Sequence, residues 1–220
     1  LPDAHRCLCS LAALKQPGPW LLGDRITLAG YNYLRNPAFA QARRLLAEGR
    51  IGRLFHLRGW VDEDYQADES LPWTWRSRAS EAGLGALGDI GVHLVSLVTT
   101  LAGPVESVVA ETAAAYATRP LPEGGEAAVE NEDIASALVR FRAGFHGVLT
   151  VSRAAWGRKS RLGFELHGSR GMIVYDQERM NELQLYDSGD RRGEQGFRTI
   201  LAGAALGLLT QGRAGSVLVD

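Results

Sequence analysis

The sequence has little cysteine and almost no net charge. Its 220 residues include two cysteines, and 24 basic and 25 acidic residues give a formal net charge of −1. The pair Cys7-x-Cys9 is too small for a zinc site or a disulfide framework and suits a reducing compartment, so no metal site is expected. A balanced charge also provides no field that would attract nucleic acid or an anionic membrane, so neither partner is expected.

Lysine is scarce, and long hydrophobic runs are missing. The two lysines are Lys15 and Lys159, so a mechanism that needs a catalytic lysine has almost no candidates. The apolar run at residues 8–14 is too short to span a bilayer and makes a poor signal sequence, so a cytoplasmic location is expected. Hydrophobic residues still make up 45% of the chain, which is enough to bury a substantial core.

Helix start and stop signals predict two helices. Asn36 is expected to cap a helix that starts with Pro37 and stops at Gly49, because glycine is favoured just past a helix end. A second helix is expected at residues 84–101, where apolar residues recur every three or four positions. The intervening residues 62–83 include a long, polar and aromatic stretch without a period, which is typical of a loop that presents functional side chains.

The remaining patterns predict strands. These are expected at residues 25–33, 52–65, 105–116, 134–141, 145–154, 162–168, 171–176 and 182–186, with hairpin turns after Phe141 and at 168–171. Because most of these strands follow one another without alternating helices, the sequence predicts an α+β fold with an open, mostly antiparallel β-sheet and helices packed on one face. One domain is expected at 26–201, between an irregular N-terminal segment, 1–25, and an irregular tail, 202–220.

Residues 83–93, GLGALGDIGVH, contain the G-x-G-x-x-G spacing of a dinucleotide-binding loop. Such a loop needs a hydrophobic strand directly before its first glycine, because that strand delivers the turn to the pyrophosphate. The preceding WTWRSRASEA is polar and charged, and hairpins follow instead of βαβ units, although Glu111 ends the next strand much as a ribose-binding acid would. We therefore predict no cofactor-binding residues here. Small residues instead imply that this helix lies close to another backbone or to a ligand.

Asp89 and His93 are four residues apart on the second predicted helix, so their side chains are expected on one face. A carboxylate beside an imidazole raises the pKa of the histidine or fixes its tautomer, which suits a proton donor or acceptor. Spacing alone favours an ordinary polar pair on a solvated face, but the apolar surroundings and the preceding PWTWR loop favour a functional pair. Three further histidines are isolated from one another on predicted strands and are interpreted as structural: His56, His146 and His167.

The sequence resembles the second domain of the glucose-fructose oxidoreductase, inositol dehydrogenase and MocA family over residues 26–201. The resemblance rests on five blocks in the same order: AGYNYLRNPAFAQARRLLAEGRIGRL, PWTWR, GLGALGDIGVHLVSLV, VENEDIASALVRF and GRKSRLGFELHGSRGMIVYDQERMNELQLY. The D-x-x-x-H spacing in the third block is the family's catalytic signature. The aromatic loop and the Gly-Arg-Lys-Ser segment are most similar to the branch with inositol and levoglucosan dehydrogenases.

The resemblance implies a substrate and oligomerisation domain. Complete family members carry a Rossmann domain with NAD or NADP and oxidise a secondary hydroxyl of a sugar or cyclitol. The resemblance assigns the catalytic pair to His93, as proton acceptor, and Asp89, as its orienter or a substrate ligand. It places five further residues near the substrate: Tyr31, Asn32, Arg35, Trp75 and Arg76. The implied partners are a small-molecule sugar or polyol and further copies of the chain, bound through the sheet face.

The sequence also departs from the family pattern. No Rossmann domain precedes residue 26, and the family's Glu-Lys-Pro motif with its catalytic lysine is missing, since Lys15 lies too close to the first block. The last residues, 202–220, do not resemble the family's end. We therefore expect a dehydrogenase that is truncated at both ends. The five blocks quoted above are not expected to bind a cofactor by themselves.

Three functions remain open on the sequence. The chain is the catalytic-residue half of an NAD(P)-dependent sugar or cyclitol dehydrogenase, inactive in hydride transfer without a cofactor domain. Alternatively, it is a stand-alone domain that binds sugar or assembles without redox chemistry. The third possibility is a cofactor-free acid-base enzyme, such as an epimerase or lyase, that uses Asp89 and His93.

Overall fold

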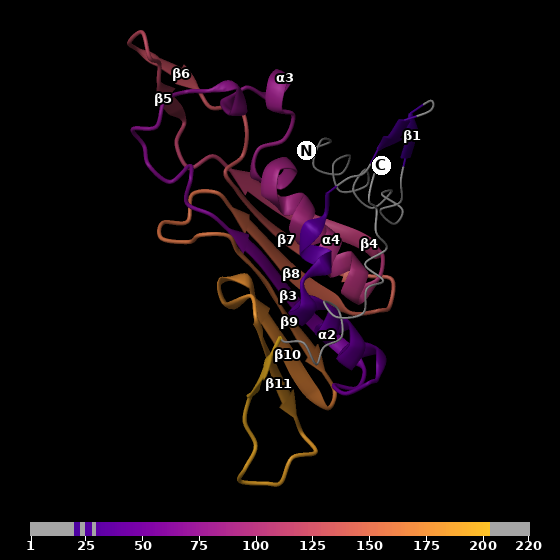
Figure 1. The fold of residues 1–220 in the computed structure, drawn as a ribbon. Coiled ribbons are helices and arrows are strands. Elements are labelled where there is room, and N and C mark those ends of the chain that lie inside the picture. The colour runs from indigo at the N-terminus through magenta and orange to yellow at the C-terminus, as the bar shows by residue number, and fades with distance from the viewer. Residues whose placement is uncertain (1–19, 23–24, 28–29, 203–220) are drawn as a thin grey trace.

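The computed structural model describes residues 20–22, 25–27 and 30–202, and an eight-stranded sheet forms its centre (Figure 1). The strand order is β12-β11-β10-β9-β3-β8-β7-β4. The strands are β3 Leu54–Asp62, β4 Val105–Ala113, β7 Ile134–Phe141, β8 His146–Ser152, β9 Arg161–Gly168, β10 Gly171–Asp176, β11 Glu182–Asp187 and β12 Arg198–Leu201. Neighbouring strands are antiparallel except β3 and β8, which are parallel. The predicted α+β fold with a mostly antiparallel sheet is confirmed.

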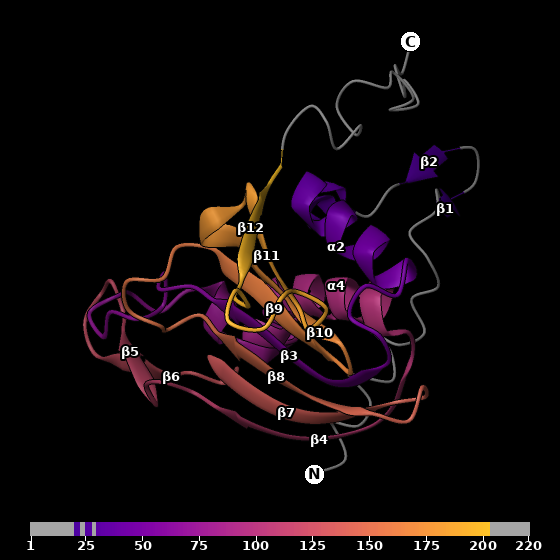
Figure 2. The ribbon, with the colours of Figure 1, turned by 90° about the horizontal axis from the view of Figure 1, so that it is seen from below.

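Two helices, α2 Pro37–Ala47 and α4 Val92–Ala102, lie on the same side of the sheet (Figure 2). The Asn36 side chain accepts hydrogen bonds from the first backbone N–H groups of α2, and Pro37 is the first helical residue, as the sequence predicts. Phe39 of α2 is fully buried and meets Phe164 of β9 edge to face, with ring centroids 6.1 Å apart. The helices and the inner sheet face therefore share one apolar core.

The second predicted helix is present but irregular. Within the predicted bounds lie the π-helical segment η3 Leu87–Gly91 and α4, and the short helix α3 Ala79–Ala82 precedes them. The stretch Ala79–Ala102 is long and apolar enough, by length and composition alone, to cross a membrane. Leu94, Leu97 and Val98 are instead buried against the sheet, so packing in the core accounts for the apolar character of α4.

The predicted strand at 25–33 is wrong beyond Thr27 in the part that the structure describes. β1 Trp20–Leu22 pairs with β2 Arg25–Thr27, whereas Asn32–Arg35 forms a 3₁₀ helix, η1, that leads into the Asn36 cap. A second small hairpin, β5 Thr118–Pro120 with β6 Glu126–Ala128, was not predicted and projects beyond the sheet (Figure 1). The expectations for residues 1–19 and 203–220 fall outside the described residues.

The three strand histidines are neighbours in space, so the expectation that they are isolated is wrong. His56 on β3 is paired with His146 on β8 and with His167 on β9. The rings of His56 and His167 lie 5.2 Å apart, and burial, followed by the charge of His167, lowers the pKa of His56. Non-local pairing of β3 between β8 and β9 brings them together. Among the described residues no group of histidine, cysteine and acidic side chains could hold a metal ion.

Candidate active site

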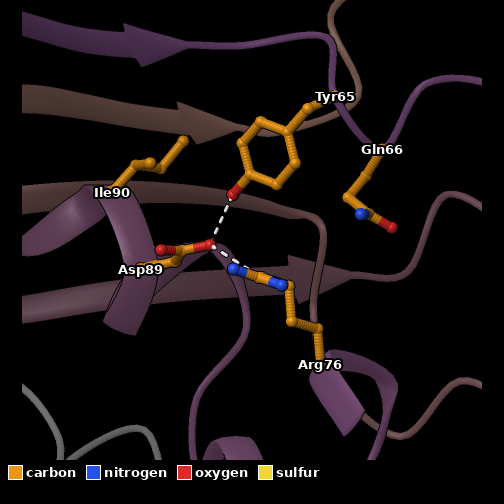
Figure 3. A pocket seen from close by; sticks show the side chains of 5 residues that line it. All are labelled: Tyr65, Gln66, Arg76, Asp89 and Ile90. Carbon is orange, nitrogen blue, oxygen red and sulfur yellow. Dashed lines mark hydrogen bonds and ion pairs between the residues drawn. The ribbon is translucent and has the colours of Figure 1, made fainter. Parts of the chain in front are cut away.

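Asp89 lies in η3, directly before α4, and its carboxylate faces a cavity of about 320 Å³ (Figure 3). The cavity is lined by Tyr65, Gln66, Arg76, Asp89 and Ile90. The Tyr65 hydroxyl donates a hydrogen bond of 2.6 Å to Asp89 Oδ2, and Arg76 Nε lies 3.9 Å from the same oxygen. The π-helical turn that presents Asp89 is a feature often met at functional sites.

Tyr65 reaches Asp89 from the loop that follows β3. Burial, followed by the hydrogen bond to Asp89, raises the pKa of Tyr65 above its ordinary value. The phenol is therefore protonated at neutral pH and acts as the donor in this pair. Asp89 in turn has a second oxygen that Tyr65 leaves free, and this oxygen is able to accept a hydrogen bond from a ligand hydroxyl.

His93 lies one turn further along, in α4, and its ring contacts two tyrosines. Its ring meets Tyr33 edge to face with centroids 4.8 Å apart, and Tyr31 with centroids 6.0 Å apart. Burial lowers the pKa of His93, while the charge of Asp89 acts in the opposite direction. The imidazole is therefore neutral near pH 7, the state in which it accepts a proton. Its Nδ1 is buried and has no hydrogen-bond partner among the described residues.

Asp89 and His93, which were expected to form a pair, interact through charge and not through a hydrogen bond in the described part of the chain. The hydrogen-bond partner of Asp89 Oδ2 is Tyr65, and no hydrogen bond joins Asp89 to His93 in the part of the chain that the structure describes. The charge of Asp89 nevertheless opposes the lowering of the His93 pKa by burial. Their roles in catalysis stay a prediction.

The other predicted substrate residues divide into two groups. Arg76 lines the cavity, and Tyr31 contacts His93. Trp75 does not line the cavity; it is 50% exposed, and the Arg76 guanidinium lies 4.6 Å from its ring. Asn32 and Arg35 are exposed on η1 and do not line the cavity either. The structure therefore brings Arg76 and Asp89 together at one cavity, whereas His93 and the other predicted ligands are not among the residues that line it.

Sequence reasoning missed Tyr65, Gln66 and Ile90 as cavity residues and did not single out Tyr33 as a neighbour of His93. The loop at 62–83, which was expected to present functional side chains, contributes Tyr65, Gln66 and Arg76 to the cavity. No local pattern distinguishes these residues from the other polar and aromatic residues of the loop. Their selection depends on tertiary contacts.

Of the glycines before Asp89, Gly85 allows the predicted close approach to another backbone, whereas Gly83 has no atom within 4 Å of an added Cβ. A Cβ added to Gly85 would collide with the backbone oxygen of Glu132. The same oxygen accepts a 2.8 Å hydrogen bond from the N–H of Ala86, and the Glu132 carboxylate accepts one of 2.9 Å from that of Leu87. The residues directly before Gly83 form α3 and not a strand. This segment therefore lacks the strand-to-helix geometry of a dinucleotide-binding loop.

Comparison with protein families identifies the class. The model of the GFO/IDH/MocA C-terminal domain matches residues 39–174. This match spans more than half of the chain, and the chain belongs to the GFO/IDH/MocA family through this domain.

Individual relatives extend the comparison. Levoglucosan dehydrogenase of Pseudarthrobacter phenanthrenivorans is 36% identical over 193 residues, which cover 82% of this chain and 50% of that protein. D-Xylose dehydrogenase of Paenarthrobacter nicotinovorans is 29% identical over 148 residues, which cover 63% of this chain and 37% of that protein. A solved levoglucosan dehydrogenase in complex with NADH and L-sorbose has a TM-score of 0.77 and 38% identity, covering 80% of this chain and 47% of that one. The chain spans about half the length of the levoglucosan dehydrogenases that it matches.

Proposed function

We propose that the chain is the substrate-binding and catalytic-residue domain of an NAD(P)-dependent oxidoreductase that acts on a secondary hydroxyl of a sugar or cyclitol. The observation that carries this proposal is the cavity at Asp89, whose carboxylate lies between the Tyr65 hydroxyl and the Arg76 guanidinium. Its volume of about 320 Å³ is at the lower end of the range for small-molecule sites, which suits a single sugar ring.

The donors and acceptors around the cavity match a polyol. The Asp89 carboxylate is an acceptor, the Arg76 guanidinium is a donor, and the Gln66 carboxamide supplies one of each. Ile90 adds an apolar surface for the C–H groups of a sugar ring. His93, neutral near pH 7, is the proposed base that takes the proton of the hydroxyl being oxidised, and Asp89 orients the substrate by accepting from a second hydroxyl.

The nicotinamide cofactor implied by the relatives does not fit the glycine-rich segment of this chain. Glu132 lies against Gly85 and accepts hydrogen bonds from the N–H groups of Ala86 and Leu87, two of the donors that a pyrophosphate would need. We therefore propose that NAD or NADP is held by residues other than those described, and we assign no reaction step to it here.

The test is NAD(P)H formation from levoglucosan, D-xylose, L-sorbose and myo-inositol, followed by absorbance. The chain is assayed alone and together with any cofactor domain that its gene or a neighbouring gene encodes. We expect turnover only in the second case, reduced about a hundredfold by His93→Ala. Turnover that is unchanged in both His93→Ala and Asp89→Asn would overturn the proposed roles. Conversion of a polyol without any nicotinamide would instead support the cofactor-free alternative.

We also propose that copies of this chain associate through the sheet face opposite the helices. Among the described residues no helix covers this face (Figure 2). Val109 of β4 and Leu138 of β7 are cross-strand neighbours and are 75% and 62% exposed. Exposed apolar neighbours of this kind are typical of protein interfaces.

A further inference from the structure

Arg119 of β5 is a buried arginine whose guanidinium binds backbone carbonyls. Its side chain is 1% exposed and is the largest of the fully buried side chains among the described residues. Its guanidinium donates hydrogen bonds of 2.7 Å to the backbone carbonyls of Gln66 and Asp68 and lies 5.3 Å from the ring centre of Tyr116. In the described part of the chain it forms no ion pair, although its charge adds to the hydrogen bonds from Ser70 in lowering the pKa of Asp68. Burying a charge carries a large desolvation penalty. We therefore ask what the two hydrogen bonds of the Arg119 guanidinium do.

Both hydrogen bonds of Arg119 go to the loop after β3. Gln66 is held at both ends of its backbone: its C=O accepts from Arg119, and its N–H donates to the carbonyl of Arg153, 2.9 Å away. Tyr116 adds a 2.8 Å hydrogen bond from its hydroxyl to the carbonyl of Ala67. This stretch has no regular secondary structure, so these attachments fix its backbone.

The second attachment point, Arg153, is itself rigidly held. Its guanidinium forms a 2.7 Å ion pair with Asp133, and both side chains are almost fully buried. The loop is therefore hydrogen-bonded to Arg153, directly after β8, and to Arg119 in the β5–β6 hairpin. The two arginines bind the loop in different ways. Arg119 binds it through its guanidinium, whereas Arg153 binds it through its backbone carbonyl.

We propose that Arg119 is a positioning residue for the candidate active site. By fixing the backbone at Gln66 and Asp68, it aims the Tyr65 hydroxyl at Asp89 and holds the Gln66 side chain at the cavity. It does not line the cavity and acts through the loop alone. Its effect on substrate affinity rests on the proposed function, whereas its effect on Tyr65 does not.

The first experiment needs no substrate. Ring signals of the six tyrosines are recorded by NMR, and the Tyr65 signal is assigned by its loss in Tyr65→Phe. Asp89→Asn shows where this signal moves when the hydrogen bond changes. We expect Arg119→Met to move the Tyr65 signal, Arg119→Lys to move it less, and the exposed control Arg191→Met to leave it unchanged. A Tyr65 signal that moves in Asp89→Asn but not in Arg119→Met would overturn the proposal.

The second experiment is a double-mutant cycle on polyol affinity, using the polyol that binds the wild-type protein best. We expect Arg119→Met to weaken binding about tenfold, the loss that corresponds to roughly one hydrogen bond. In a Tyr65→Phe background the same substitution should add little, because both changes act through one contact. Fully additive losses would contradict an action through Tyr65.

Folding is checked by circular dichroism and thermal unfolding. If Arg119→Met does not fold, the double variant Tyr116→Phe/Arg119→Lys replaces it. Tyr116→Phe removes only the hydroxyl that binds the Ala67 carbonyl. The double variant must shift the Tyr65 signal in the same direction as Arg119→Lys alone. An unchanged signal in that folded variant counts against the proposal. If no polyol binds the wild-type protein, the proposed function fails, and the NMR experiment alone decides the role of Arg119.

Discussion

Asp89 has two neighbours that define its chemistry, a phenol that donates to it and a guanidinium near the same oxygen. Neither contact is visible in the D-x-x-x-H spacing, which suggested a pairing with His93. The sequence pattern could single out Asp89 and His93 as candidates, because polar residues interrupt an otherwise apolar helix. It could not indicate that a tyrosine 24 positions earlier is the partner of Asp89, since that contact depends on the path of a loop.

The charge of Asp89 is expected to control the titration of His93. Burial lowers the pKa of His93 below the ordinary 6.5, and Asp89 partly reverses this shift. We predict that Asp89→Asn lowers the pKa of His93 further, because the opposing charge is removed. The measurement is an NMR titration of the histidine ring signals, with the His93 signal assigned by His93→Ala. A pKa that stays constant or rises in Asp89→Asn would contradict this electrostatic coupling.

The same shift predicts how His93 affects stability. Because its pKa is lowered on folding, the unfolded chain binds more protons than the folded one between the lowered pKa and 6.5. The free energy of unfolding therefore rises with pH through this window, and this stabilisation is lost as pH falls. We expect urea unfolding to show a shallower loss of stability from pH 7 to pH 5 in a folded His93→Gln variant than in the wild type. An equal loss in both would show that His93 does not contribute.

The ion pair between Arg153 and Asp133 is expected to contribute strongly to the stability of the fold. The side chains are 3% and 1% exposed, so removing one leaves the other charge buried without its partner. We predict that Asp133→Asn lowers the free energy of unfolding by about 3–5 kcal/mol. The control Glu194→Gln acts on an exposed pair with Arg191 and should change stability by less than about 0.5 kcal/mol. Denaturant unfolding measures both, and equal effects would refute the distinction.

At the scale of elements, local signals predicted much of the fold. The Asn36 cap, Pro37 and Gly49 defined α2, and the hairpin turns defined the β7–β8 and β9–β10 pairs. Two features escaped prediction for physical reasons. The parallel pairing of β3 with β8 joins residues far apart in the sequence, so no turn marks it. The β5–β6 hairpin has strands of three residues each, too short for an alternating pattern to emerge.

The fit of η3 against Glu132 gives an element-scale prediction. Gly85→Ala places a methyl group on the backbone of Glu132, so η3 must shift and carry Asp89 with it. We expect a destabilisation of roughly 1–3 kcal/mol by overpacking, together with weaker polyol binding. Gly196→Ala is the control, because an added Cβ there meets no atom within 4 Å. Unfolding and binding measurements that do not distinguish the two variants would count against the close approach.

At the scale of the whole molecule, the open sheet face predicts self-association. Leu138→Glu places a charge at the exposed centre of β7, next to Val109, and we expect it to convert an oligomer at micromolar concentration into a monomer. Arg43→Glu changes the charge of an exposed residue on α2, on the helix-covered side, and should leave the oligomer intact. Sedimentation velocity compares them. A wild-type chain that is already monomeric would contradict the proposal.

Calorimetric titration of the chain with levoglucosan, L-sorbose, D-xylose and myo-inositol tests whether the cavity at Asp89 binds a polyol. We predict saturable binding of at least one of them, weakened by about 10- to 100-fold in Asp89→Asn, because a hydrogen bond to a charged acceptor is lost. Glu194→Gln, which removes an exposed carboxylate far along the chain, should bind as the wild type does. Failure of all four compounds to bind, or equal affinity in Asp89→Asn and the wild type, would contradict the account.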